Sequence, residues 1–452
     1  MPKPRRTILC VAAYGCTALM IVGLSSGASF AETGISQVAV PGSVSLVSVT
    51  AAGNPSEMAS RVPSARPVLS HHGRFVVFQS RDSELAGTDT NGLEDVFLRD
   101  RGQATTQLVS EAGGAAVGGG GATVSANGRY VAFLSASPDL SPDDTNGDKF
   151  DVFIRDMVTG EVALVSRATD GSQRNRDSDA AVISADGSRV AFSTSARLSV
   201  DDHDPADPEK WKQQDVYVHN VAMGTTRLAS VRRNGNDFVG PVGLGGISAD
   251  GRTVGFAWGS LGRHSEAPGG FYVRDLSNPG STLLWREKIL AGGTNDGAPA
   301  VSGDGDVAAF ASDSDLLDPD PNFSVYDLAV VDVISRELTV VSEGLAGRDA
   351  HGDSWAPTLS FDGGAVAFAS EATNLVRHDD NDVSDAFHYE VGEATSLLSR
   401  GTDAPGSFAS ASGGGVAISG DGRHVAFHSF ANNLVEGDTN SNSDVFLWTS
   451  AV

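Results

Sequence analysis

The stretch SANGRYVAFLS, residues 125–135, decides the fold because the chain repeats it. An Asn-Gly pair precedes a short apolar segment whose aromatic and β-branched residues are typical of a strand. Since glycine tolerates positive φ, Asn-Gly or Asp-Gly between apolar segments predicts a hairpin turn. The turn glycine here is Gly128, and the other copies have Gly73, Gly187, Gly251, Gly305, Gly363 and Gly422 in its place.

Two further phrases accompany the copies of this turn. An apolar phrase led by aspartate follows, as in DVFLRD (95–100) and DVFIRD (151–156), and a phrase such as QLVSEAGG (107–114) closes most units. Each unit therefore offers four short strands, and no long stretch has helical periodicity. Four antiparallel strands in each of seven units predict an all-β protein, a seven-bladed β-propeller.

The two ends of the chain support this interpretation independently. The seventh unit stops at Val452, just after its third strand, and the matching closing phrase is SLVSVTAAG (45–53). We predict that this N-terminal strand completes the last blade, within a single propeller domain spanning 43–452. An open solenoid of the same units is the alternative, and the divided blade argues against it because closure removes two open sheet edges.

The first residues are typical of a signal peptide. Lys3, Arg5 and Arg6 precede an apolar segment, and the small residues Ser29 and Ala31 stand where cleavage usually occurs. We predict a signal peptide over 1–31 and a short linker over 32–42, with export by the Sec route or, given the paired arginines, the twin-arginine route. A retained single-span anchor is the alternative. The expected location is secreted, extracellular or in the cell envelope.

Composition limits the possible partners. The formal net charge is -25, which argues against nucleic acid and anionic membranes. Both cysteines, Cys10 and Cys16, lie in the predicted signal peptide, so we expect no disulfide in the mature chain. The expected partner is an extracellular protein or a glycan. We expect a monomer that does not insert into the membrane once the signal is cleaved.

The repeated turn phrase resembles the repeats of TolB-type propellers, which are relatives of the tryptophan–aspartate repeat propellers. The motif Ser-x-Asp-Gly-x-x-apolar-Ala-Phe-x-Ser carries the resemblance, as in Ser184 to Thr194. The resemblance covers about 43–449 and implies the propeller fold. TolB carries an additional α/β domain ahead of its propeller, for which this sequence offers no counterpart. The envelope role of TolB therefore does not carry over.

Acidic and amide residues recur in the loops between the second and third strands of the units, which we call the Asp/Asn loops. The first loop reads GTDTNGLED (87–95) and is matched in units two, six and seven. The candidate metal ligands are Asp89, Asn91 and Asp95; Asp144, Asn146, Asp148 and Asp151; Asp379, Asn381 and Asp385; and Asp438, Asn440 and Asp444.

Two interpretations of these loops remain open. Ca²⁺ takes six to eight oxygen ligands, and alternating Asp and Asn side chains on a tight loop could supply several of them. The loops are not EF-hands, because Gly92 stands at the fourth position and no glutamate stands at the twelfth. Alternatively, the same side chains bond backbone amides as Asx turns, a device that every blade could use. The possible cofactor is Ca²⁺, and we expect no other.

The connections between units should lie on the same side as the Asp/Asn loops, near the mouth of the channel. There we select Arg174, Asp177, Asp296, Asp353 and Trp355 as candidate ligand-binding residues. Packing between blades is the alternative role for Trp355. No catalytic residue can be assigned, because acidic pairs occur throughout and the histidines are scattered.

These observations favour a secreted, non-enzymatic binding or interaction propeller whose Asp/Asn loops calcium could stabilise. An extracellular hydrolase or lyase acting on a polysaccharide or peptide at the channel mouth is the first alternative. A structural element of the cell surface is the second.

Overall fold

The structure is a computed structural model, and it describes residues 42–451 apart from 57–65, 203–213, 235, 237, 239–241, 260–268, 279, 287–297, 313–324, 378, 380, 382, 402–414, 439 and 441. The predicted signal peptide and residues 32–41 of the linker lie outside the described residues. Residues 39–452 form one compact unit. Within its described part, no helix is long and apolar enough to cross a membrane.

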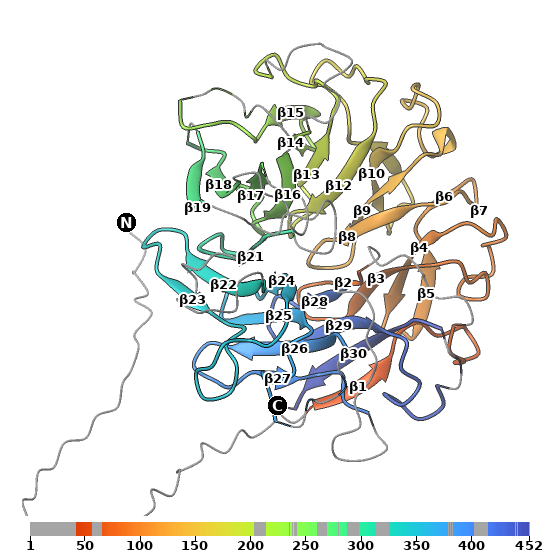
Figure 1. Cartoon of the computed structure of the whole chain (residues 1–452). Coiled ribbons are helices and arrows are strands. Elements are labelled where there is room, and N and C mark those ends of the chain that lie inside the picture. The colour runs from red at the N-terminus through yellow and green to blue at the C-terminus, as the bar shows by residue number, and fades with distance from the viewer. Residues whose placement is uncertain are drawn as a thin grey trace, which may run out of the picture. The chain divides into compact units, whose positions relative to one another are not determined.

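The predicted fold class is confirmed, because seven four-stranded antiparallel sheets form a ring of blades (Figure 1). Blades one to three contain β2 (Val68–Leu69), β3 (Phe75–Ser80), β4 (Asp95–Asp100) and β5 (Thr105–Leu108); β8 (Gly120–Val124), β9 (Tyr130–Ser135), β10 (Asp151–Asp156) and β11 (Val162–Leu164); and β12 (Ser178–Ile183), β13 (Arg189–Thr194), β14 (Asp215–Asn220) and β15 (Thr225–Leu228).

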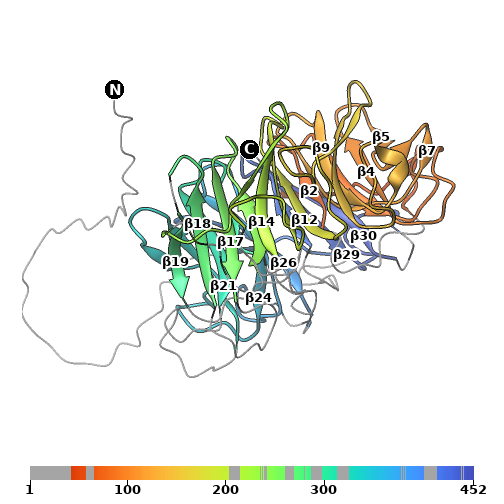
Figure 2. The same cartoon turned by 90° about the horizontal axis from the view of Figure 1, so that it is seen from above.

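Blades four to six follow the same order. They contain β16 (Val242–Ile247), β17 (Thr253–Trp258), β18 (Gly270–Asp275) and β19 (Thr282–Arg286); β20 (Ala300–Val301), β21 (Val307–Ser312), β22 (Asp327–Asp332) and β23 (Leu338–Val340); and β24 (Ser354–Leu359), β25 (Ala365–Ser370), β26 (Asp385–Glu390) and β27 (Ser396–Leu397). Figure 2 shows strands of neighbouring blades, such as β14 and β17, from a second direction.

The seventh blade joins the two ends of the chain, as predicted. Its strands are β28 (Val416–Ile418), β29 (His424–Ser429), β30 (Asp444–Ser450) and the N-terminal β1 (Gly42–Leu46). β1 pairs antiparallel with β30, with Ser45 opposite Leu447. The additional hairpin of β6 (Glu111–Ala112) and β7 (Ala115–Ala116) and the 3-10 turn Pro138–Leu140 were not predicted.

A second closure links the hairpin turns of all seven blades. In each turn the repeated serine accepts a hydrogen bond from the amide five residues later, as Ser125 Oγ does from Tyr130 N at 2.9 Å. Each turn also donates one backbone hydrogen bond to the next blade, at 2.7–3.2 Å. These seven bonds join His71 to Ala126, Ala126 to Ala185, Ala185 to Ala249, Ala249 to Gly303, Asp304 to Phe361, Phe361 to Gly420 and Asp421 to His71. The result is an unbroken ring.

The core consists of seven apolar clusters of buried residues from the blades. The repeated phenylalanine of the second strand lies opposite an aromatic residue of the third, as Phe133 does opposite Phe153. In blade five the opposite residue is Ala329, and Phe310 instead contacts Phe271 and Trp285 of blade four. Aromatic pairs of this kind add to the stabilisation from area burial alone.

One buried histidine predicts acid sensitivity. Burial lowers the pKa of His428 to about 4, and its Nε2 atom has no hydrogen-bond partner. In the unfolded chain the His428 imidazole has its ordinary pKa near 6.5 and takes up a proton below that pH. In the folded protein it stays neutral down to about pH 4. Stability is therefore lost as the pH falls from 6.5 towards 4, and His428 alone should account for about 2 kcal/mol at pH 5.

The matched variant for this prediction is His428→Leu, which cannot be protonated. Denaturant unfolding at pH 7.5 and pH 5 should show that the variant loses about 2 kcal/mol less than the wild type on acidification. Equal losses in the two proteins would place the acid sensitivity elsewhere.

Candidate functional site

The Asp/Asn loops and the connections between blades lie against each other, as expected for a four-stranded meander. In blade two, Asn146 Nδ2 donates a hydrogen bond to the carbonyl of Arg174 at 3.0 Å. The amide of Phe150 donates to Asp177 Oδ1 at 3.0 Å, and the amide of Ser178 donates to the carbonyl of Phe150. One side of the propeller therefore carries both sets of candidate residues.

The aspartate that begins the third strand is held by a serine that lies two residues beyond the end of the fourth strand. Ser110 Oγ donates to Asp95 Oδ1 at 2.5 Å and accepts from the amide of Val96 at 2.9 Å. The same pair recurs at 2.5–2.9 Å in the other blades that have an aspartate there: Asp151 with Ser166, Asp215 with Ser230, Asp327 with Ser342, Asp385 with Ser399, and Asp444 with Ser48. Blade four has Gly270 at this position.

Sequence reasoning missed these serines. The signal was present, because a Ser ends the apolar part of most closing phrases, as in QLVS (107–110). The Asx-turn interpretation paired the aspartate with amides of its own loop, whereas the serine that holds it follows the fourth strand. The pair fixes the start of the third strand to the end of the fourth, so this aspartate has a structural role in every blade that carries the pair.

Burial of these aspartates raises the pKa of several of them. The pKa of Asp385 is raised to about 6 and that of Asp444 to about 7, in each case chiefly by burial. Burial also raises the pKa of Asp151. A buried carboxyl group of this kind is most stable when it is protonated, hydrogen-bonded or close to a cation.

The first aspartate of each Asp/Asn loop lies beside this buried pair and finds different donors in different blades. In blade two, Gln173 Nε2 donates to Asp144 Oδ1 at 3.1 Å and to Asp151 Oδ2 at 2.9 Å. In blade three the hydroxyl group of Tyr217 donates to Asp202 at 2.6 Å. In blade six, Asn381 Nδ2 donates at 2.9 Å to Oδ2 of Asp385, the aspartate that begins the third strand.

Blade one has no such donor among the described residues. Asp89 and Asp95 are 2% and 0% exposed, and the Oδ2 atoms of both lack a hydrogen-bond partner. Asp89 Oδ1 accepts a hydrogen bond from the amide of Asn91, and at 3.4 Å this bond is long. Burial, and after it the charge of Asp95, raises the pKa of Asp89.

The remaining metal candidates fall into two groups. Asp438 and Asp444 of blade seven are buried, and the Asn440 amide donates to the carbonyl of Ser56 at 2.9 Å. Asp379 is also buried, whereas Asp148 lies exposed on its loop. Across the described residues, no three His, Cys, Asp or Glu side chains are grouped so that they could hold one ion. Any cation in these loops therefore needs amide, backbone or water oxygens as well.

The selected connection residues are largely engaged with their neighbours. Asp353 repeats the contact of Asp177, because its Oδ1 accepts from the amide of Tyr326 at 2.9 Å. Arg174 is exposed, donates to Ser172 Oγ at 2.8 Å, and lines a pocket of about 590 Å³ together with Arg197. Asp296 lies outside the described residues.

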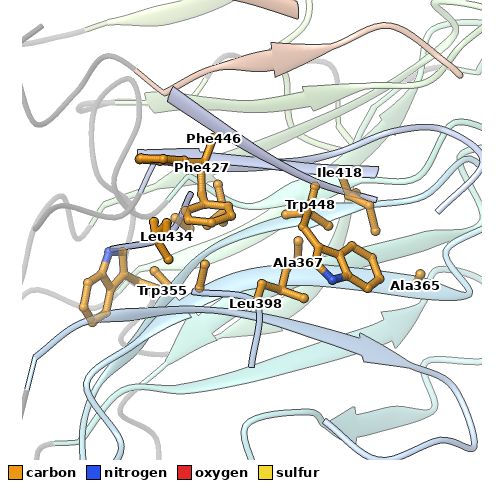
Figure 3. Close-up of a cluster of buried hydrophobic side chains, with 14 of the residues drawn as sticks. Trp355, Ala365, Ala367, Leu398, Ile418, Phe427, Leu434, Phe446 and Trp448 are labelled. Carbon is orange, nitrogen blue, oxygen red and sulfur yellow. The ribbon is translucent and has the colours of Figure 1, made fainter. Parts of the chain in front are cut away.

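Trp355 belongs to the hydrophobic core. Its side chain is 4% exposed and packs in the cluster shared by blades six and seven (Figure 3). Leu434 and Phe446 belong to the same cluster. The indole ring therefore fills the alternative role, packing between blades.

A pocket of about 730 Å³ was not anticipated from the sequence. It is lined by Arg232 and Arg233 after β15, by Phe238, by Trp258 and Tyr272 of blade four, by the β18–β19 turn, and by Arg336 of blade five. The guanidinium group of Arg232 lies 5.2 Å from the ring centre of Phe238 and 5.5 Å from that of Trp258. By contrast, the hollow among the inner strands near Asp179 measures only about 20 Å³.

The charge of this pocket is opposite in sign to that of the chain. Three arginines line it, and the single acidic residue is Asp275. Hydrogen bonds from Ser277 and Asn278 hold the pKa of Asp275 below its usual range, so this carboxylate is already bound within its own turn. The ion pairs found among the described residues do not include Arg232, Arg233 or Arg336.

Comparison with known proteins defines the architecture alone. No protein-family model and no curated protein matches the chain. Among solved structures, an oligogalacturonate lyase from Vibrio parahaemolyticus is similar at 10% identity, with a TM-score of 0.53, over 91% of this chain and 98% of that one. An oligogalacturonate lyase in complex with manganese matches at 9% identity and a TM-score of 0.51, over 92% and 97%.

TolB proteins are also among the matching structures. TolB from Acinetobacter baumannii matches at 14% identity and a TM-score of 0.37, over 60% of this chain and 52% of that one. The seven four-stranded sheets themselves show the propeller fold, and the likeness of the turn phrase to TolB-type repeats remains a resemblance. Identities this low show a shared fold and nothing about activity.

Proposed function

We propose that the chain is an exported, non-enzymatic binding propeller, and that its ligand is an acidic saccharide held in the pocket beside Arg232. One observation carries the proposal: a pocket with three arginines and three aromatic side chains in a chain whose net charge is -25. Guanidinium groups bind carboxylates through paired hydrogen bonds, and aromatic faces pack against the apolar face of a sugar ring. The pocket volume of about 730 Å³ is within the usual range for small-ligand sites.

The arrangement favours binding in the pocket beside Arg232 over binding at the channel mouth. This pocket is far larger than the hollow among the inner strands. Asp177 and Asp353 are already engaged, because each accepts a hydrogen bond from a backbone amide of the loop beside it. The aromatic side chains are also held in place, because Phe238 is buried and contacts both Trp258 and Tyr272. A rigid pocket of this kind loses little conformational entropy when a ligand binds.

Acidic and neutral oligosaccharides compared on a glycan array should test this proposal. We expect binding to acidic members, weakened by salt. Arg232→Ala should reduce affinity about tenfold or more, because a hydrogen bond to a charged group contributes roughly 1.5–3 kcal/mol. Arg174→Ala is the matched control, since this exposed arginine lines the separate pocket with Arg197, and it should bind as the wild type does.

Two results would count against the proposal. Equal affinity for neutral and acidic saccharides would remove the role of the arginines. Cleavage of the bound saccharide would favour the alternative, an extracellular hydrolase or lyase.

A further inference from the structure

The Asp/Asn loop of blade one differs from those of blades two and three in what surrounds its two carboxylates. In blade two, the amide group of Gln173 bridges the two aspartates. In blade three, the hydroxyl group of Tyr217 reaches Asp202. Both groups donate hydrogen bonds to buried carboxylates.

Neither donor has an equivalent in blade one. Phe97 occupies the third position of its strand, where blade three has Tyr217, and a phenyl ring has no hydroxyl group. The connection after β5 passes the loop as a glycine-rich segment, residues 118–121, whose Gly118 amide donates to Asp95 Oδ1 at 2.9 Å. The Oδ2 atoms of Asp89 and Asp95 remain without a donor within the described part of the chain.

Two fully buried carboxylate oxygens without donors are costly. Leaving a buried charged group unsatisfied costs more than any ordinary hydrogen bond returns. The equivalent carboxylates of blade two are close enough for one amide group, that of Gln173, to reach both of them. A cation beside these oxygens would offset the cost that the Gln173 amide and the Tyr217 hydroxyl group offset in blades two and three.

We propose that blade one binds a divalent cation, Ca²⁺, through Asp89 and Asp95. Ca²⁺ prefers carboxylate and carbonyl oxygens and completes its shell with amide oxygens and water. Asn91 lies between the two aspartates in the sequence; its Oδ1 accepts from the amide of Leu93 at 2.6 Å, and its Nδ2 has no hydrogen-bond partner among the described residues. With two carboxylates, the site resembles the weaker extracellular calcium modules, for which dissociation constants of about 0.1–1 mM are typical.

The chain itself suggests the decisive variant. Phe97→Tyr places the hydroxyl group of blade three in blade one, where it would donate to Asp89 and take the place of the cation. Isothermal titration with Ca²⁺ should show one site fewer in Phe97→Tyr and in Asp89→Asn than in the wild type. The melting temperature of the wild type should rise by about 1–3 °C in millimolar Ca²⁺, and both variants should lose that part of the rise.

Asp202→Asn is the control, because the hydroxyl group of Tyr217 already donates to this buried aspartate in blade three, and it should keep the wild-type number of calcium sites. Identical isotherms for the wild type, Phe97→Tyr and Asp89→Asn would overturn the proposal. A wild type that binds no Ca²⁺ would also overturn it. If Asp89→Asn is then more stable than the wild type in chelator, the two carboxylates share a proton instead.

Discussion

Deletion of residues 42–50, which removes β1, should lower the free energy of unfolding by on the order of 5 kcal/mol. The deletion uncovers the whole edge of β30, to which β1 is paired. It removes Val47, which is 2% exposed, together with Val44 and Leu46, which pack against the core cluster of blades six and seven. It also removes Ser48, whose hydroxyl group donates to the buried Asp444 at 2.5 Å.

The effect should be reversible in trans. A synthetic peptide of residues 42–50, added to the deletion variant, should restore most of the melting temperature by adding the missing strand. The same peptide carrying Val47→Asp should not, because a charge would enter a buried site. A deletion variant that melts together with the intact protein would show that the N-terminal strand does not close the ring in solution.

Gly128→Ala should be among the most damaging single substitutions in a turn, with a cost of about 2–5 kcal/mol. Two penalties add at this position. Gly128 has φ of 76°, a conformation that costs any residue with a Cβ atom, and an added Cβ atom would lie 2.2 Å from the ring of Phe75 in the preceding blade. The equivalent glycines make the same contact around the ring, as Gly187 does with Tyr130.

Gly224→Ala separates the two penalties. Gly224 also has positive φ, 64°, but no atom lies within 4 Å of an added Cβ atom. This variant should lose only about 1 kcal/mol in denaturant unfolding. If both variants lose the same amount, the contact between blades contributes nothing and the backbone conformation alone explains the glycine.

The architecture could be predicted because its signals are local and repeated. The turn glycine, the phenylalanine five residues later and the aspartate of the third strand recur in register, so their spacing gives the strand order. The division of the last blade followed from one missing phrase and its match near the N-terminus. Even in unit four, whose residues 281–285 depart from the closing phrase of the other units, a fourth strand forms, β19.

The candidate sites could not be predicted to the same depth because their partners are distant in sequence. The loop of blade one looks like that of blade two until Gln173, more than twenty residues beyond Asp151, is seen to bridge one pair of carboxylates. The pocket is lined by Arg232, which follows β15 of blade three, and by Arg336 of blade five. No local sequence pattern relates these two residues. Trp355 beside Asp353 suggested a ligand contact, and only the neighbouring blade shows that the indole ring is buried.

The unbroken ring of turn-to-turn hydrogen bonds implies that the seven junctions between blades are equivalent at the turns. Each blade donates one bond and accepts one, and blade seven does so with blade one in the same way as any other neighbours do. The positions of the termini are then a matter of where the gene starts. A circularly permuted chain, with its old ends joined and new ends at the open β26–β27 turn beside Gly392, should fold to the same propeller.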